Sequence, residues 1–264
     1  MTKFSVITAC FNSVQTIQNT FDSVFLLTKY FDIEHIFIDG GSTDGTQKHL
    51  SVFSTFSHCH VISDNDHGIF DAMNKGASLA RGNFLLFLNS DDRYSLKGAK
   101  HFLSSILSQD QIVYGDIILD DNGVELPLRS RHPKYKWNFY NLPIHHPSSA
   151  VRRDVFFELN KFNLSYRYSS DFDFFLRAFI NRVNFRYIQG YVSVMASGGA
   201  GSDNKFTALK EQRRSLVVNK CFFACIFAYI RFFYQLSWQL LIYVFGNAFY
   251  RKWRLIRSNY FKDY

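Results

Sequence analysis

The fold is decided by one stretch of the chain, which reads His35-Ile36-Phe37-Ile38-Asp39-Gly40-Gly41-Ser42-Thr43-Asp44-Gly45. An apolar run passes here directly into a polar turn that is rich in glycine. A short continuous apolar run is typical of a strand buried on both faces. The polar residues after it favour a turn and the start of a helix. The stretch therefore predicts one unit of strand, loop and helix.

The same unit recurs along residues 4–118. The apolar runs are Phe4–Ala9, His35–Ile38, His60–Ser63, Phe84–Leu88 and Ile112–Ile118, and helical patterns lie near 14–29, 44–54, 69–80 and 96–108. Because strands that alternate with helices pair in parallel through right-handed crossovers, we expect an α/β fold with a mostly parallel central sheet flanked by helices. Asp121-Asn122-Gly123 predicts a hairpin, so mixed pairing is expected in the second half.

The composition is that of a globular protein with an unusual distribution of charge. The 264 residues are 47% apolar and 18% aromatic, which excludes a disordered or collagen-like chain. The formal net charge is +8, but residues 1–204 hold 19 basic and 20 acidic side chains, whereas residues 205–264 hold 11 and 2. We therefore expect a nearly neutral body, residues 1–204, followed by a basic tail, residues 205–264.

The cysteines indicate a reducing compartment. Cys10, Cys59, Cys221 and Cys225 form no C-x-x-C pair and have no partners at zinc-like spacing. We expect free thiols. No signal-peptide pattern precedes the first apolar run, so we expect the body to lie in the cytoplasm.

Polar residues follow each of the first four apolar runs. They form the segments Cys10-Phe11-Asn12-Ser13, Asp39–Gly45, Asp64–Gly68 and Asn89-Ser90-Asp91-Asp92. Ligands of open α/β sheets bind beyond the carboxyl ends of the strands, so these segments predict a site. The same residue types also serve turns and helix caps, and that alternative stays open at each position. Asp44 and Gln47, for example, predict a capping box.

Acidic loops that meet at one sheet edge repel each other unless a positive group lies among them. Asp91 and Asp92 offer the oxygen ligands that Mg²⁺ or Mn²⁺ prefers, with substrate phosphates in the remaining positions. Neither a G-x-G-x-x-G after the first strand nor a P-loop motif occurs, which disfavours dinucleotide dehydrogenases and P-loop NTPases. The pattern therefore predicts a nucleotide that binds through a metal.

Taken together, these motifs resemble the family 2 glycosyltransferases, which have the GT-A fold. Phe37–Thr46 is similar to the family's D-[DG]-G-S-T-D-G-T signature, and Thr8-Ala9-Cys10-Phe11-Asn12 resembles its opening segment. The run Asp64-Asn65-Asp66-His67-Gly68-Ile69-Phe70-Asp71-Ala72-Met73-Asn74-Lys75-Gly76 resembles the colanic-acid and exopolysaccharide subgroup. The resemblance covers residues 3–204 and implies a GT-A catalytic domain over 1–204, with a nucleotide-sugar half over about 1–118 and an acceptor half over about 119–204.

The resemblance implies roles for several residues. Asp39 would contact the nucleoside, Thr8 and Phe11 would line its pocket, and Asp66 would lie at the nucleotide end of the cleft. Asn89-Ser90-Asp91 occupies the place of the family's D-x-D motif. Asp91 would ligate the metal, and Asn89, which departs from the first aspartate of that motif, would keep an oxygen for the ribose.

The acceptor half carries the expected general base. Ser170-Asp171-Phe172-Asp173 occupies the place of the family's E-D motif, whose aspartate is the base in inverting members. Asp173 and Arg177 are four residues apart and predict an ordinary surface pair, whereas Asp171 shares its side with an apolar face that should pack inward. We therefore assign Asp171 as the base, with a helix cap as the alternative.

Two further segments belong to the acceptor side. By family position, His146 of the pair His145-His146 would face the acceptor site or the metal, and a structural histidine is the open alternative. The loop Gly198-Gly199-Ala200-Gly201-Ser202 resembles a segment that closes over the substrates, and a plain surface turn fits it equally well.

The tail predicts contact with a lipid surface. Residues 221–250 carry one charge, Arg231, and residues 232–250 are uncharged. Because Arg231, Gln235 and Gln239 recur every four residues on an otherwise apolar pattern, we expect an amphipathic helix in the membrane interface. A transmembrane span and packing on protein are the alternatives.

The resemblance thus implies a hexosyl- or N-acetylhexosaminyltransferase that is inverting, metal-dependent and non-processive. It would move a sugar from a nucleotide-diphosphate donor, a UDP-sugar, to a polyprenyl-diphosphate-linked glycan in the synthesis of lipopolysaccharide O-antigen, capsule or exopolysaccharide. We expect it as a peripheral protein on the cytoplasmic face of the plasma membrane. The rivals are a sugar nucleotidyltransferase and a non-catalytic membrane-surface protein. Nucleic acid is not expected as a partner, because the body is slightly acidic and the basic, aromatic tail interleaves few basic residues with long aliphatic runs.

Overall fold

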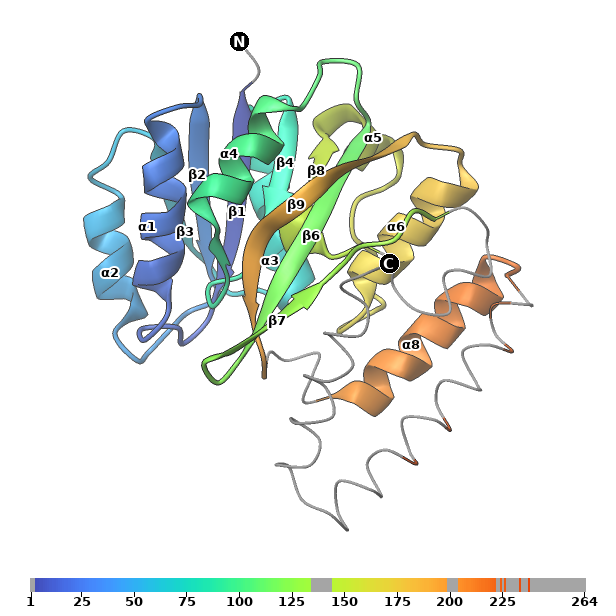
Figure 1. The fold of residues 1–264 in the computed structure, drawn as a ribbon. Helices are drawn as coiled ribbons and strands as arrows, with labels where there is room; N and C mark the ends of the chain where they lie inside the picture. The colour runs from blue at the N-terminus through green and yellow to red at the C-terminus, as the bar shows by residue number, and fades with distance from the viewer. Residues whose placement is uncertain are drawn as a thin grey trace.

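In the computed structural model, the described residues are 3–133, 144–198 and 204–221, together with four isolated positions, 224, 226, 233 and 237. Figure 1 shows the strands side by side in one twisted sheet, with helices on both of its faces. Most of the predicted membrane-interface segment, Gly199–Ser202 of the predicted closing loop, and residues 134–143 lie outside the described residues.

The chain alternates strands and helices through its first half, as the sequence predicts. The strands are β1 (Phe4–Cys10), β2 (Ile33–Asp39), β3 (Cys59–Ser63), β4 (Phe84–Phe87), β5 (Arg93–Tyr94), β6 (Ile112–Asp121), β7 (Val124–Leu128), β8 (Ser149–Arg152) and β9 (Phe185–Ala196). The helices are α1 (Ile17–Thr28), α2 (Thr46–Phe53), α3 (Ile69–Leu79), α4 (Leu96–Ser104), α5 (Arg153–Glu158), α6 (Ser170–Ile180) and α8 (Lys205–Val218).

The sheet has the order β3-β2-β1-β4-β8-β6-β9-β5, and β7 pairs with β6. β1 pairs in parallel with both β2 and β4, and β2 with β3, which confirms the parallel first half. β6 does not pair with β4, because β8 lies between them and runs antiparallel to both. The long strand β9 pairs in parallel with β6. The sheet is therefore mixed in its second half.

The predicted hairpin is confirmed. Asp121 pairs with Val124 across a two-residue turn in which Asn122 and Gly123 have φ of 52° and 87°. Positive φ at both central positions defines the type I′ turn, whose twist matches that of the flanking strands. Asn and Gly are the residues that tolerate this backbone conformation best.

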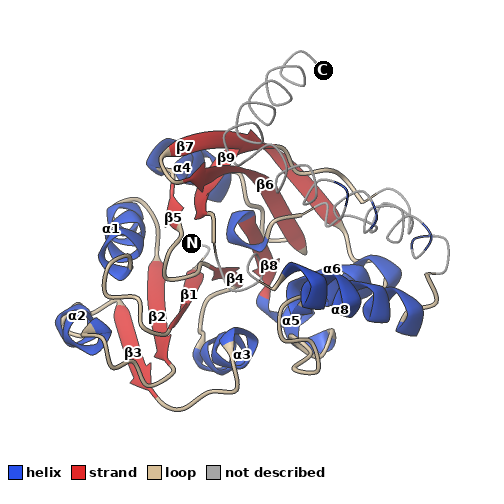
Figure 2. Cartoon of the chain, turned by 90° about the horizontal axis from the view of Figure 1, so that it is seen from below, coloured by secondary structure: helices blue, strands red, loops and turns tan. Residues whose placement is uncertain are grey.

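Three hydrophobic clusters of the described residues pack on the two faces of the sheet. Figure 2 shows α1, α2 and α4 on one side, and α3, α5, α6 and α8 on the other. Successive residues of β1 point to opposite faces, so Ile7 packs in the core with α3 and α6, whereas Phe4 and Val6 pack with α1 and α4. Phe21 of α1 stacks on Phe53 of α2 with ring centroids 4.1 Å apart.

The predicted boundary after residue 204 falls immediately before α8. This helix packs on α6, and Leu216 at its end and Cys221 beyond it are buried in the same core as α6. The described start of the predicted tail is therefore in contact with the predicted acceptor half. Among the residues that the structure describes, no helix is both long enough and apolar enough to cross a membrane.

Candidate active site

A network of hydrogen bonds joins the segments that follow β1 and β2 at their carboxyl ends. Asn12, which has a positive φ of 48°, donates its backbone N–H to the Ser42 hydroxyl (2.9 Å) and accepts one from the backbone N–H of Thr43 (2.9 Å). The backbone N–H of Ser13 donates to the Thr46 hydroxyl (2.8 Å). The predicted signature loop is therefore a rigid part of the sheet edge.

Asp39 is the centre of this loop. Its carboxylate is fully buried and accepts hydrogen bonds from the Ser42 backbone and hydroxyl, from Gln47 Nε2 (3.1 Å) and from the Ser63 hydroxyl (2.8 Å). The predicted contact of Asp39 with a nucleoside remains a prediction. In this structure the carboxylate at the end of β2 is hydrogen-bonded to the end of β3 through Ser63 and to the start of α2 through Gln47.

The predicted capping box of Asp44 and Gln47 is wrong. Asp44 accepts instead from the backbone N–H and hydroxyl of Thr46 and from the backbone N–H of Val14. The residue that precedes the helix is Gly45, and Gln47 reaches back to Asp39. Gln47 thus adds one more donor to the buried carboxylate of Asp39, beside those of Ser42 and Ser63.

Asp66 lies directly over Gly40. A Cβ built on Gly40 would lie 2.6 Å from Asp66 Oδ2, so the Asp66 carboxylate fills the space of a missing side chain. Asp66 also accepts from the backbone N–H of Gly68 (2.8 Å), which precedes α3. The structure thus brings Asp66 to the signature loop, at the edge where the nucleotide is predicted.

The two other residues of the predicted nucleoside pocket lie in different surroundings. Phe11 is 64% exposed and presents an aromatic face beside the signature loop. Thr8 is fully buried, and its hydroxyl lies 2.9 Å from His35 Nε2. Thr8 therefore offers no exposed side-chain atom to a ligand, whereas Phe11 does.

The segment Asn89–Asp92 follows β4 at the same sheet edge. Thr20 of α1 donates its hydroxyl to the backbone carbonyls of Asp92 (2.7 Å) and Ser90 (3.0 Å). Asp92 is buried and accepts from the backbone N–H of Ala196 (3.0 Å) and from Asn89 Nδ2 (3.0 Å). Thr20 of α1 thus holds the backbone of the D-x-D-like loop, and Ala196 of β9 holds the side chain of Asp92.

Burial raises the pKa of the Asp91 carboxyl, and the nearby His146 acts in the opposite direction. Burial also raises the pKa of Asp92 to about 7, with a further contribution from the charge of Asp91. Two carboxylates that are adjacent and shielded from water disfavour the charged state of each other. A cation bound at Asp91 would relieve this repulsion.

His146 and Asp171 meet at the carboxyl side of the sheet. Nδ1 of His146 lies 3.2 Å from Oδ2 of Asp171, and both side chains are 15% exposed. His146 also acts electrostatically on Asp91 and Asp92. The structure therefore gathers the predicted base, the predicted acceptor-side histidine and the predicted metal ligand. The open alternative for Asp171 also has support, because its Oδ1 accepts from the backbone N–H of Phe172 (2.8 Å).

The donor set of this cluster fits a hard divalent cation. Asp91 supplies a carboxylate, and two buried side-chain atoms nearby, Asn89 Oδ1 and His146 Nε2, have no hydrogen-bond partner. The described residues contain no group of three or more His, Cys, Asp or Glu that could by itself hold a metal. Mg²⁺ and Mn²⁺ suit such a sparse site, because they keep waters and substrate phosphates as ligands.

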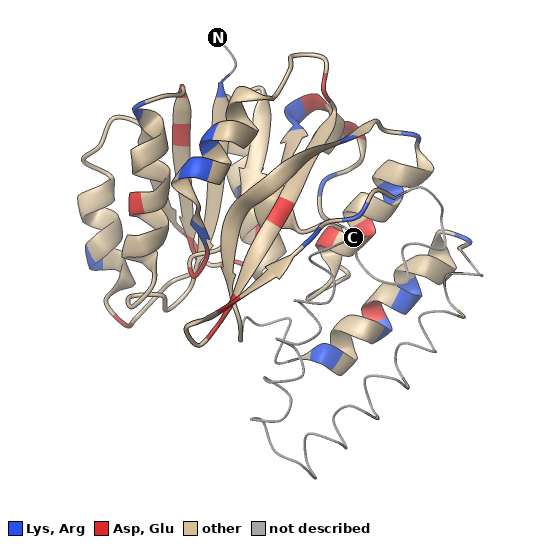
Figure 3. Cartoon of the chain, viewed as in Figure 1, with Lys and Arg blue, Asp and Glu red and all other residues tan. Residues whose placement is uncertain are grey.

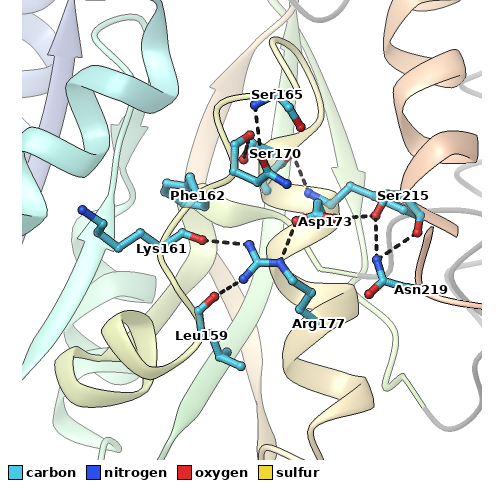
Figure 4. A network of polar contacts seen from close by, with 12 residues as sticks. Leu159, Lys161, Phe162, Ser165, Ser170, Asp173, Arg177, Ser215 and Asn219 are labelled. Atoms are coloured by element: carbon cyan, nitrogen blue, oxygen red, sulfur yellow. Dashed lines mark hydrogen bonds and ion pairs between the residues drawn. The ribbon is translucent and has the colours of Figure 1, made fainter.

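The predicted pairing of Asp173 with Arg177 is confirmed, but its predicted place on the surface is wrong. Asp173 is 2% exposed and accepts from Arg177 Nε (2.7 Å) and from the Ser215 hydroxyl of α8 (2.7 Å). Figure 4 shows Arg177 between this carboxylate and the backbone carbonyls of Leu159 and Lys161. The pair is buried because α8 covers it, and the spacing of the two residues contains no sign of that helix.

Sequence reasoning also missed Glu211 of α8. Its carboxylate accepts from three consecutive backbone N–H groups, those of Arg167 (2.9 Å), Tyr168 (2.8 Å) and Ser169 (3.0 Å), immediately before α6. The only signal available from the sequence was an isolated acid among basic residues, which is visible on α8 in Figure 3.

The fold and this cluster suit the class of nucleotide-sugar-dependent glycosyltransferases, to which the comparisons with known proteins assign the chain. Residues 5–169, more than half of the chain, match the model of the family "Glycosyl transferase family 2", and the chain belongs to that family. A protein of Mycobacterium tuberculosis named "PGL/p-HBAD biosynthesis glycosyltransferase" is 30% identical over 191 residues, which cover 67% of this chain and 70% of the relative. The predicted family is thus confirmed, while these curated relatives are mycobacterial and not of the colanic-acid subgroup.

Solved structures confirm the GT-A fold. The Staphylococcus aureus TarS fragment 1–349 in complex with UDP-GlcNAc has a TM-score of 0.64 at 19% identity, covering 81% of this chain and 66% of that one. The mannosyltransferase PcManGT of Pyrobaculum calidifontis, in complex with GDP-Man and Mn²⁺, has a TM-score of 0.63 at 14% identity, with 82% and 63% covered. The chain spans 39% of the longer TarS structure.

Proposed function

We propose that this chain is an inverting, metal-dependent, non-processive glycosyltransferase that uses a UDP-sugar. The observation that carries the proposal is the contact between His146 and Asp171 beside Asp91. It places a base candidate, an imidazole and a metal-ligand candidate in one cluster at the carboxyl edge of the sheet.

In the proposed reaction, Asp171 accepts the proton of an acceptor hydroxyl while that oxygen attacks the anomeric carbon of the donor sugar. The bond from that carbon to the diphosphate breaks, and the nucleoside diphosphate leaves with the bonding electrons. His146 holds the carboxylate of Asp171 through Nδ1. Asp91, with Asn89, would hold Mg²⁺ or Mn²⁺, which neutralises charge on the diphosphate. A single displacement from the face opposite the leaving group inverts the anomeric carbon.

We propose Phe11 and Asp66 as the residues that receive the nucleoside, Phe11 through its exposed ring and Asp66 through its carboxylate over Gly40. Asp39 and Thr8 would support this pocket from beneath, because both side chains are fully buried. The UDP-GlcNAc bound by TarS supports a uridine nucleotide as donor.

For the acceptor, we propose a lipid-linked glycan, with a polyprenyl diphosphate as the lipid carrier, in the synthesis of a surface polysaccharide. The mycobacterial relatives, which are named for PGL/p-HBAD biosynthesis, support a glycoconjugate acceptor. The net positive charge of residues 205–264 supports contact with a membrane surface on its cytoplasmic face. Deletion of residues 222–264 is expected to abolish sedimentation with anionic vesicles, and unchanged sedimentation would contradict this part of the proposal.

The central experiment measures release of nucleoside diphosphate from a panel of sugar nucleotides with Mn²⁺ or Mg²⁺. We expect wild-type protein to turn over one of them. Asp91→Ala should lose metal-dependent binding of the nucleoside diphosphate. Asp171→Asn, which keeps the shape of the side chain but removes the base, should bind the donor normally and lose most of its turnover.

The matched control is Asp22→Asn, which removes a carboxylate from α1 where it contacts only the exposed Gln18 in the described structure. This variant should bind and turn over the donor as the wild type does. Two results would contradict the assignment of the site. One is binding of donor and metal by Asp91→Ala at wild-type affinity, and the other is wild-type turnover by Asp171→Asn.

A further inference from the structure

We propose that Glu211 is a positioning residue for catalysis, which holds the turn before α6 and thereby fixes Asp171. The inference rests on the proposed function, in which Asp171 is the base. It assigns to α8, which belongs to the basic tail by composition, a part in building the active site.

Three backbone donors meet at the carboxylate of Glu211. Oε1 of Glu211 accepts from the backbone N–H of Arg167, and Oε2 accepts from those of Tyr168 and Ser169. Consecutive N–H groups converge on an anion only when the backbone curls around it. Because bonds to a charged acceptor are stronger than neutral ones, this carboxylate fixes the conformation of the turn.

The turn that Glu211 binds leads directly into α6. Ser169 is the residue that precedes α6, and Asp171 is the second residue of the helix. Ser169 does not cap the helix with its own side chain, because its hydroxyl donates to the backbone carbonyl of Ala208 in α8 (3.0 Å). Glu211 and Ala208 of α8 are therefore both hydrogen-bonded to Ser169, which lies two residues before Asp171. These bonds hold the start of α6.

The contact between α8 and α6 continues further along α8. Ser215 lies one turn after Glu211 on α8, and it donates to the buried Asp173. Asn219 lies one further turn along and donates to the Ser215 backbone carbonyl (2.9 Å). Ser215 and Asn219 are shown in Figure 4. Glu211 and Ser215, four residues apart on α8, thus bond the two residues that flank Asp171 at a separation of two: Glu211 bonds Ser169 before it, and Ser215 bonds Asp173 after it.

The geometry separates two effects. Ser215 stabilises α6 through the side chain of Asp173, which also accepts from Arg177. Residues two apart on a helix point to different sides, so Asp173 does not share the side on which Asp171 contacts His146. Glu211 fixes the turn that leads directly into the first residues of α6, where Asp171 lies. Loss of Ser215 should therefore weaken the fold, whereas loss of Glu211 should also displace the base.

The experiment compares Glu211→Gln with Ser215→Ala and Glu158→Gln in the full chain. Gln keeps the size of Glu but turns an amide group towards backbone donors. Glu158→Gln makes the same chemical change on an exposed residue at the end of α5. The probe is the sugar nucleotide that the wild type turns over fastest, with Mn²⁺.

For Glu211→Gln we expect faster amide hydrogen exchange at 167–169. We also expect a fall in kcat of about tenfold or more, with donor affinity within about twofold of wild type. Ser215→Ala should lower the melting temperature at least as much, yet keep slow exchange at 167–169 and most of the kcat. In a background of Asp171→Asn, the substitution Glu211→Gln should cost little further turnover, because it acts through the missing base.

Three results would overturn the inference: wild-type kcat in Glu211→Gln, donor affinity that falls in parallel with kcat, or an equal fall in turnover with and without the Asp171 carboxylate. A failure of the proposed function is a different result, because it is wild-type turnover in Asp171→Asn alone. The exchange rates at 167–169 test the three hydrogen bonds whatever the reaction is.

Discussion

His146 and Asp171 are 25 residues apart in sequence, and their side chains meet with Nδ1 3.2 Å from Oδ2. A carboxylate can only accept a hydrogen bond, so Nδ1 carries the proton of this contact. In the neutral ring Nε2 then keeps a lone pair, and this atom is buried without a hydrogen-bond partner in the described structure. His146 Nε2 therefore keeps a lone pair that no described residue uses. Such a nitrogen is suited to bind the hydroxyl of the sugar acceptor or a metal.

We predict that His146→Ala lowers turnover at saturating donor and Mn²⁺ by about tenfold or more, because Asp171 loses the group that orients it. His146→Asn, whose amide can donate from nearly the position of Nδ1, should retain more turnover than the alanine variant. Steady-state kinetics of both variants provide the check. Equal rates for the two would contradict an orienting role, and a raised Mn²⁺ requirement in both would assign His146 to the metal.

Thr20 is expected to support the metal loop from α1. Its buried hydroxyl serves the backbone carbonyls of Ser90 and Asp92. Thr20→Val keeps the shape but leaves these carbonyls without their donor, at a cost of about 1 to 3 kcal/mol of unfolding free energy. Weaker Mn²⁺-dependent nucleotide binding should accompany the loss, and Thr20→Ser should restore it.

The control for this prediction is Thr28→Val in the same helix, where the hydroxyl donates only to the carbonyl of Phe25. Chemical denaturation and titration with nucleoside diphosphate provide the two measurements. If Thr20→Val destabilises the protein but leaves nucleotide affinity intact, the loop does not depend on this hydroxyl.

Asn74 links the predicted nucleotide-sugar half to the predicted acceptor half. Its Nδ2 donates to the Phe162 carbonyl (2.9 Å), and its Oδ1 accepts from the Phe162 backbone N–H (3.1 Å). Asn74→Leu removes both bonds from a buried site, and we expect a loss of about 2 to 4 kcal/mol in urea denaturation. Asn19→Leu, on the exposed side of α1, should change stability by less than about 0.5 kcal/mol. Equal losses in the two variants would contradict the link.

Glu34 makes stability depend on pH. Burial by itself raises the pKa of this carboxyl, but hydrogen bonds from the Ser5 hydroxyl and from the backbone N–H groups of Arg81 and Gly82, together with the charge of Lys3, lower it below its ordinary value of 4.5. A carboxyl whose pKa is lower in the folded state stabilises the fold above its unfolded pKa. This stabilisation is lost as the pH falls through the folded-state pKa.

Glu34→Gln should therefore be less stable than wild type at pH 7, by about 2 kcal/mol, and the difference should shrink as the solution becomes acidic. Urea denaturation at a series of pH values measures this difference. Glu158→Gln, at the exposed end of α5, should run parallel to the wild type at every pH. A deficit in Glu34→Gln that is constant down to strong acid would mean that the charge of Glu34 has no part.

The first half of the sheet could be predicted because each strand there is a continuous apolar run followed by a turn. β8 escaped prediction because it has only four residues, Ser149–Arg152, and its pattern has no alternation. Its insertion between β4 and β6 changes the neighbours of both strands without changing their directions. Such an insertion depends on contacts that are distant in sequence, which local patterns do not encode.

The candidate site was predictable to a similar degree. Asp91, Asp171 and His146 were identified from motifs, and the structure brings them together. Glu211 was not identifiable, because its partners are backbone N–H groups that lie 42 to 44 residues earlier and have no side-chain signature. Asp173 was misplaced for a related reason, since only α8 makes it a buried residue.

The contact of Asp66 with Gly40 also couples these two positions in the evolution of the loop. A Cβ added at position 40 would lie 2.6 Å from Asp66 Oδ2, so the Asp66 carboxylate would have to move aside. The effect of a side chain at position 40 therefore depends on which residue stands at position 66, and substitutions at the two positions are not expected to be additive.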